Sequence, residues 1–135
     1  MPEPVIICLH QPALELAEKV ASLCDGEVHG LQSRVNTIPE TFEKTKEHLQ
    51  DLFQKGHPLV GICSSGILIR SLADVLSDKH TEPPVLAVAE DGSCVIPLLG
   101  GHHGANDLAR KIASGLGVVA AVTTAGDLKF GIALD

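Results

Sequence analysis

Aromatic residues are almost absent from this chain of 135 residues, which has three phenylalanines and neither tryptophan nor tyrosine. Proteins that bind single-stranded nucleic acid stack the bases on aromatic rings, so this composition argues against that class. The formal net charge of -7 also repels phosphate backbones, and we therefore expect no nucleic-acid partner. Without aromatic residues the core must be built from valine, isoleucine, leucine and alanine, a composition typical of buried parallel strands.

Long apolar runs and closely spaced cysteines are missing as well. No segment approaches the roughly 18 apolar residues that a membrane helix needs. The first residues lack the basic region of a signal peptide, so we expect a soluble protein with no membrane partner. The four cysteines form no C-x-x-C pair, which excludes a zinc ribbon and a thioredoxin-like motif. Isolated thiols of this kind suit a reducing cytoplasm, where we expect the protein to act.

Runs typical of strands alternate along the chain with spacings typical of helices. We expect strands at residues 5–9, 27–31, 59–63, 85–89, 94–99 and 118–122. Helices are expected after Pro12, from the capping box Thr37-Ile-Pro-Glu40 to Lys55, over residues 67–76, and after Gly104. The helix at residues 67–76 is apolar on almost every side, which predicts deep burial against a sheet.

The pair Asp91-Gly92 lies between two apolar runs and predicts an antiparallel hairpin. The rest of the alternation predicts a mostly parallel sheet with helices on both faces. The expected fold is therefore α/β, a three-layer α/β/α domain with a mostly parallel sheet and one β-hairpin. We expect residues 1–135 to form one domain. Because the chain stops soon after a short apolar tail, we also expect it to be the amino-terminal part of a longer protein.

Three polar, glycine-containing segments each follow an aliphatic run: residues 63–66, 100–106 and 123–127. Ligands of open α/β sheets bind at the carboxyl ends of parallel strands, so we expect these segments to line one cleft. The substrate-binding candidates are Ser64, Ser65, Gly66, Arg70, Gly100, Gly101, Gly104, Asn106, Thr123, Thr124 and Asp127.

The segment 100–106 carries two histidines between glycines. Glycines let the backbone approach a ligand, and free N–H groups at a helix start attract anions. His102 and His103 could act as acid or base near neutral pH, and they are the catalytic candidates. Two histidines are too few to predict a metal site. The alternative is a tight turn in which Asn106 or Asp107 stabilises the first helical turn.

The other candidates also have two interpretations. The Ser64-Ser65-Gly66 segment lacks the G-x-S-x-G pattern of a nucleophilic serine, so donors for a carboxylate or a plain helix cap are favoured. Arg70 is either a carboxylate anchor or a solvated residue at the edge of a buried face. The residues at 123–127 either line the cleft or form a turn.

Four motifs carry a family resemblance. They are Gly66-Ile-Leu-Ile-Arg70, the hairpin of residues 84–99, Gly101-His-His-Gly-Ala-Asn-Asp-Leu-Ala109 and Val122-Thr-Thr-Ala-Gly-Asp127. Their order and spacing resemble the amino-terminal region of the cobalt-precorrin-5A hydrolase (CbiG) family. The resemblance implies a role in cobalamin (vitamin B12) biosynthesis, where that family opens the ring A δ-lactone and releases acetaldehyde. Two differences stand out: the histidine loop is one residue shorter, and Gly126 replaces the family's usual threonine.

The shorter loop resembles an extension found ahead of some precorrin-3B C17-methyltransferase domains. On this resemblance we expect a domain that binds a tetrapyrrole (precorrin) intermediate beside a fused or associated methyltransferase. We expect no cofactor in this domain, because S-adenosylmethionine would belong to the methyltransferase. Two alternatives stay open: an active lactone hydrolase with His102 or His103 as general base, and a non-catalytic docking domain.

Overall fold

The computed structural model describes residues 2–124 and contains a six-stranded sheet in the order β3-β2-β1-β4-β5-β6. The strands are β1 (Val5–Cys8), β2 (Glu27–Leu31), β3 (Thr41–Phe42), β4 (Leu59–Ile62), β5 (Val85–Val88) and β6 (Val95–Leu99). Neighbours from β3 to β5 pair in parallel, and only β6 is antiparallel to its neighbour β5. The expected mostly parallel sheet with one hairpin is confirmed.

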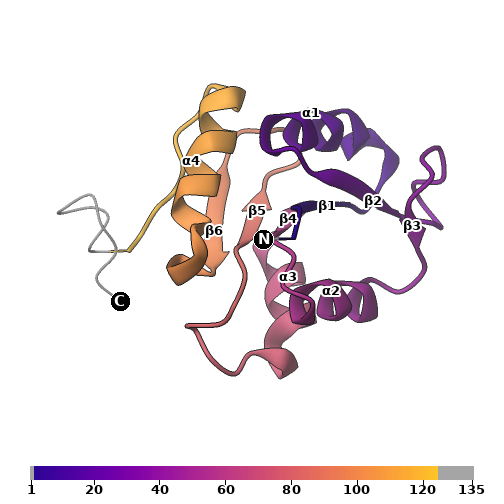
Figure 1. Cartoon of the computed structure of the whole chain (residues 1–135). Coiled ribbons are helices and arrows are strands. Elements are labelled where there is room, and N and C mark those ends of the chain that lie inside the picture. The colour runs from indigo at the N-terminus through magenta and orange to yellow at the C-terminus, as the bar shows by residue number, and fades with distance from the viewer. Residues whose placement is uncertain (1, 125–135) are drawn as a thin grey trace.

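Helices cover both faces of the sheet and give the three expected layers (Figure 1). They are α1 (Leu14–Cys24), α2 (Thr45–Gln54), α3 (Ser65–Leu72) and α4 (Ala105–Leu116). Side chains alternate across a strand, so Ile6 packs in the core under α1 and α4 while Ile7 packs in the core under α2 and α3. Both isoleucines are fully buried.

The helix expected from residue 37 begins only at Thr45. Residues 41 and 42 form β3 instead, because the Glu40 carbonyl accepts a hydrogen bond from the Gly30 N–H of β2 at 3.0 Å. Pro39 contributes to this outcome, since the residue before a proline is disfavoured in helical conformation. The expectation of a capping box at residues 37–40 is wrong.

Two further expectations need correction. Helix α3 ends at Leu72, followed by a short 3-10 turn (Ala73–Val75), and is not buried on every side: Ile69 is 54% exposed. A helix lying on a sheet buries only the side that faces it. Residues 118–122 form no strand; Ala120 makes a single parallel bridge to Val95 beside β6. Pro97 is compatible with β6 because this strand lies at the margin of the sheet.

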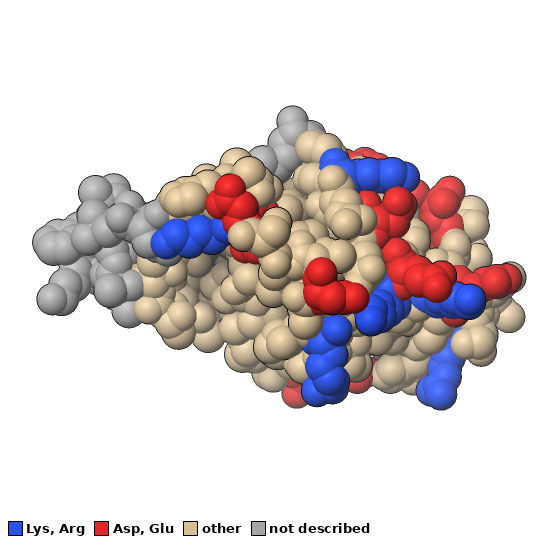
Figure 2. Space-filling view, turned by 90° about the horizontal axis from the view of Figure 1, so that it is seen from below, with Lys and Arg blue, Asp and Glu red and all other residues tan. Residues whose placement is uncertain are grey.

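The face formed by α2 and α3 carries interspersed acidic and basic side chains (Figure 2). Three exposed ion pairs involve α2 or its N-cap: Lys44–Glu47, Lys46–Asp74 and Lys55–Asp51. Exposed pairs of this kind contribute little to stability, about 0 to 1 kcal/mol each. Among the residues described, no helix combines the length and the apolar character needed to cross a membrane.

Candidate functional site

The sheet separates the sequence-predicted site residues into two groups at opposite edges. We call the edge where β1, β4 and β5 end the carboxyl edge, and the edge where they begin the amino edge. Residues 63–66 follow β4 and lie at the carboxyl edge. Strand β6 runs the other way, and its last residue Leu99 pairs with Val85, the first residue of β5. Residues 100–106 therefore lie at the amino edge, and the expectation of a single shared cleft is wrong for them.

A pocket at the amino edge brings six of the predicted residues together. These residues are Gly100, Gly101, His102, Asn106, Thr123 and Thr124. The last two reach the pocket because the stretch around Ala120 runs parallel to β6, so the residues after it approach the end where Leu99 lies. Asp127, also predicted, lies outside the residues that the structure describes.

Gly100 fixes the backbone of this pocket. Its φ is +86°, and a Cβ there would lie 2.5 Å from the Pro83 carbonyl oxygen and from the backbone of Pro84, so only glycine fits. The Gly100 carbonyl accepts hydrogen bonds from the N–H groups of His103 at 2.9 Å and Ala105 at 3.2 Å. These two N–H groups therefore close a tight turn, as the alternative interpretation anticipated, and do not point to a ligand.

Asn106 connects α4 to the segment that follows it. Its side chain is 8% exposed, and its Nδ2 donates a hydrogen bond to Thr124 Oγ1 at 3.3 Å. The amide of Asn106 and the hydroxyl of Thr124 are thus held together on one wall of the pocket. Such fixed polar groups orient a bound ligand within a pocket.

The two adjacent histidines have different surroundings. His102 lines the pocket, and its ring centroid lies 4.3 Å from that of His80. His103 Nε2 lies 2.6 Å from the His80 carbonyl oxygen, and its side chain faces a separate depression that includes Pro58 and Pro84. Of the two predicted catalytic histidines, the geometry therefore favours His102 as the group that meets a ligand in this pocket.

Two pocket residues were missed by the sequence reasoning, Glu82 and Lys79. Glu82 is 8% exposed, and no hydrogen bond or ion pair of its carboxylate is found within residues 2–124. An acidic residue just before Pro83-Pro84, at the start of a buried strand, was the only available signal. A nearly buried carboxylate in a pocket that an imidazole also lines can serve as a general base.

The carboxyl-edge residues are more open to solvent, and the side chains of Ser64 and Arg70 are both exposed. Ser64 is the N-cap of α3, but its side chain makes no capping hydrogen bond. The Arg70 guanidinium folds back over Gly66, with Nη1 3.0 Å from the position a Cβ would take there. His10 pairs with the Glu90 carboxylate at this same edge. Ser65 begins α3, so these four predicted residues share one region that is separate from the amino-edge pocket.

Burial dominates the chemistry of the thiol beside these residues. Cys63 is 5% exposed, and desolvation, helped by the negative charge of Glu90, raises its pKa to about 11. A thiol with this pKa stays protonated at neutral pH and is a poor nucleophile. The carboxyl edge thus holds no activated sulfur at this position.

Comparison with known proteins adds independent information. Residues 47–127 match the model of the family described as cobalamin synthesis G N-terminal. The chain is 39% identical over 88 residues to the cobalt-precorrin-5A hydrolase of Priestia megaterium, covering 64% of this chain and 24% of that protein. It is 44% identical over 78 residues to the cobalt-precorrin-5A hydrolase of Salmonella typhimurium strain LT2, covering 57% of this chain and 22% of that protein. The chain therefore spans less than a quarter of the length of these relatives.

A solved structure has a similar fold. It is that of a cobalamin biosynthesis protein G homologue from Sulfolobus solfataricus, with a TM-score of 0.66 and 23% sequence identity. The match covers 90% of this chain and 36% of that one. At this identity the likeness supports the fold alone.

Proposed function

Because this chain belongs to the cobalamin synthesis G N-terminal family, we propose that it takes part in opening the ring A lactone of cobalt-precorrin-5A. The family resemblance noted from the sequence motifs is confirmed, and its pathway is cobalamin biosynthesis. The relatives' hydrolase activity favours the lactone-opening alternative over a methyltransferase-linked role. The free thiols of all four cysteines suit a cytoplasmic setting for this reaction.

The observation that carries the proposal is the Glu82 carboxylate, nearly buried in the same pocket as His102. Hydrolysis of a lactone needs a base that takes a proton from water, so that the water oxygen can add to the lactone carbonyl. Glu82 or His102 supplies that base, and collapse of the tetrahedral intermediate then breaks the ring C–O bond. The immediate products are a carboxylate and a hydroxyl group on the opened ring. Loss of the hydroxyl proton then breaks the bond between the hydroxyl-bearing carbon and the macrocycle, which releases that carbon and its methyl group as acetaldehyde and leaves a proton on the macrocycle carbon.

The remaining pocket groups suit the rest of such a substrate. The hydroxyls of Thr123 and Thr124 can donate hydrogen bonds to the oxyanion of the intermediate or to substrate carboxylates. Lys79 supplies a positive charge, which a polycarboxylate ligand needs on a chain with a net charge of -7. The pocket thus combines a base, neutral donors and a cation.

The proposal is tested by acetaldehyde release from cobalt-precorrin-5A, together with a spectroscopic titration of the tetrapyrrole. One of the two variants Glu82→Gln and His102→Ala removes the base. We expect that variant to lower the rate of acetaldehyde release by about 100-fold or more. The matched controls are His103→Ala, which changes the adjacent histidine outside the pocket, and Arg70→Ala at the carboxyl edge. Both controls should keep the wild-type rate.

Two outcomes would contradict the assignment. A wild-type chain that gives neither acetaldehyde nor a spectral change at saturating tetrapyrrole would leave only the docking role. A loss of binding in Arg70→Ala with unchanged binding in Glu82→Gln would move the site to the carboxyl edge.

A second candidate function keeps the binding and omits the hydrolysis. In this case the domain holds a tetrapyrrole for a fused or partner methyltransferase that binds S-adenosylmethionine. One observation favours it: the shortened loop uses the N–H groups of His103 and Ala105 internally, through the Gly100 carbonyl, and leaves fewer donors for an oxyanion. A spectral change on titration without acetaldehyde release would support this candidate over the hydrolase.

A further inference from the structure

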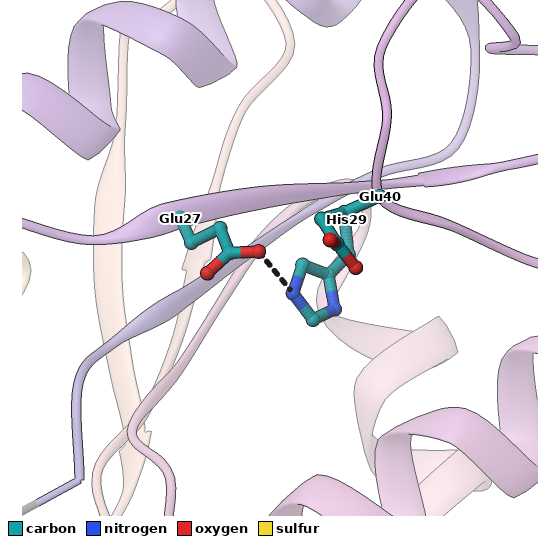
Figure 3. A group of neighbouring side chains, drawn as sticks. All are labelled: Glu27, His29 and Glu40. Carbon is teal, nitrogen blue, oxygen red and sulfur yellow. Dashed lines mark ion pairs between the residues drawn. The ribbon is translucent and has the colours of Figure 1, made fainter.

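Three ionisable side chains come together on β2 and β3. In the strand order these two strands lie at the end of the sheet far from β6 and the amino-edge pocket. Glu27 and His29 lie two residues apart on β2, and alternation therefore puts both side chains on the same face. Glu40 directly precedes β3, where Gly30 pairs with Thr41, so the register places Glu40 opposite His29. The three side chains converge on one point (Figure 3).

The distances in this group fit a metal ion. One candidate ligand atom from each residue lies within 4.8 Å of the other two, and His29 Nε2 is 3.4 Å from Glu27 Oε1. Two ligands bound at about 2.1 Å around a tetrahedral zinc ion lie about 3.4 Å apart. The Glu27–His29 pair therefore already has the spacing of two metal ligands, and the Glu40 carboxylate, within 4.8 Å of both, must come closer to complete the set.

A second histidine fixes the orientation of the first. His29 Nδ1 lies 2.8 Å from Nε2 of His48, which comes from α2 and stacks on Phe42 with ring centroids 4.5 Å apart and an interplanar angle of 10°. The His29 side chain is only 15% exposed, so its ring is held in place, and its Nε2 faces the Glu27 carboxylate. An imidazole whose other nitrogen is hydrogen-bonded in this way is the usual arrangement for a metal-binding histidine.

We propose that Glu27, His29 and Glu40 bind a divalent transition-metal ion of the zinc class. One nitrogen and two carboxylate oxygens suit such an ion, and three protein ligands leave a coordination position for water. The ion joins Glu40 to β2 and so strengthens the attachment of β3, which has only two residues. The site lies outside residues 47–127, which match the family, and does not depend on the proposed hydrolase function.

Calorimetric titration of the full 135-residue chain with Zn²⁺ alone, under reducing conditions, tests the proposal. We expect saturable binding of one ion, and at least a tenfold weaker Kd in His29→Ala, Glu27→Gln and Glu40→Gln. Saturating Zn²⁺ should also raise the midpoint of thermal unfolding of the wild type and leave that of Glu40→Gln unchanged. Glu40 is exposed, so this variant is expected to fold even if His29→Ala does not.

The control variant is His57→Ala, which removes a histidine outside the group, and it should bind Zn²⁺ as the wild type does. X-ray absorption of the zinc-loaded chain gives a readout that needs no variant: we expect one imidazole, oxygen ligands and no sulfur at about 2.3 Å. Sulfur ligands, several imidazoles, equal binding by His29→Ala, or no saturable binding would each overturn the proposal. In the last case the group holds no metal ion and keeps only the Glu27–His29 contact.

Discussion

The two edges of the sheet differ in how their polar groups are satisfied. At the carboxyl edge His10 contacts the Glu90 carboxylate, and the side chains of Ser64 and Arg70 are exposed to water. At the amino edge Glu82 is nearly buried in the same pocket as His102 and has no protein partner within the described residues. A polar group that water already solvates gains less from a ligand than a group that is nearly buried and left unpaired.

This difference has a topological cause. Parallel α/β sheets bind ligands at the carboxyl edge because the loops that feed their helices lie there. In this protein the last strand of the sheet is reversed, and the turn after β6 delivers a glycine-rich segment to the amino edge instead. A single antiparallel strand is therefore enough to put the candidate site on the edge that a purely parallel sheet leaves unused.

The largest effect is expected from three glycine substitutions that test whether the amino edge is built around one backbone position. Gly100→Ala places a Cβ against the backbone of Pro83 and Pro84 at a φ of +86°, and it should lower the free energy of unfolding by about 3 to 5 kcal/mol. Gly104 has a φ of +90° but open space around it, so Gly104→Ala should cost only about 1 to 2 kcal/mol.

Gly101→Ala is the matched control, because no atom of residues 2–124 lies within 4 Å of a Cβ at that position. It should change the free energy of unfolding by less than about 0.5 kcal/mol. Urea unfolding of the three variants measures the series. Equal effects at Gly100 and Gly101 would mean that the turn does not depend on the close approach to β5.

A pH-dependent effect is expected at the carboxyl edge, from Cys63. Burial raises the pKa of this thiol in the folded protein to about 11, whereas the ordinary pKa of a cysteine thiol is 9.0. This stabilisation is fully present below about pH 9 and is lost as the pH rises to about 11, a total of about 2 to 3 kcal/mol. Burial also raises the pKa values of Cys8 and Cys24, and both act in the same direction.

Cys63→Ala isolates the contribution of Cys63. Unfolding measured at about pH 8 and about pH 11 should show a smaller loss of stability for this variant than for the wild type. Cys94→Ala, at a partly exposed thiol, should retain the wild-type loss. If Cys63→Ala shows the full alkaline loss of the wild type, the Cys63 thiol is solvated in the folded protein.

Most of the fold could be predicted from the sequence, because aliphatic runs and helical spacings specify local structure strongly. The hairpin followed from Asp91-Gly92, and the site loop was recognised from its glycines and histidines. Local signals also misled where two elements compete for the same residues. The Thr37-to-Glu40 spacing matches the pattern of a capping box, but the residues that follow Pro39 pair with β2 and form a strand instead.

The same error concealed the proposed metal site. Glu27 and His29 share a face by simple alternation, but Glu40 joins them only if β3 exists and pairs in the observed register. His48 comes from α2, nineteen residues after His29, and no local pattern connects the two. Sites assembled across strands in this way need the strand order, which local sequence patterns do not provide.

Glu82 was missed because it also meets its pocket partners only in the folded chain. The assignment of residues 100–106 to the carboxyl edge failed for a different reason. The hairpin was expected, yet its consequence for the direction of residues 100–106 was not used, and the three polar segments were assigned to one edge. The direction of a strand decides at which edge of the sheet the next segment begins. Because β6 is reversed, the segment after it lies at the amino edge, a full strand length away from the carboxyl edge. Composition and glycine content cannot reveal this displacement.

The smallest effect on the free energy of unfolding is expected when one polar side chain at each edge is removed. Asn106→Ala removes a nearly buried amide and its hydrogen bond to Thr124, which should lower the free energy of unfolding by about 1 to 2 kcal/mol. Ser64→Ala would cost about 1 kcal/mol at a typical N-cap, but the Ser64 side chain makes no capping bond, so the change should stay below about 0.5 kcal/mol. Chemical unfolding of both variants measures the difference. If Ser64→Ala costs as much as Asn106→Ala, the carboxyl edge contains a hydrogen bond to this hydroxyl, and Ser64 is not simply solvated as its exposure indicates.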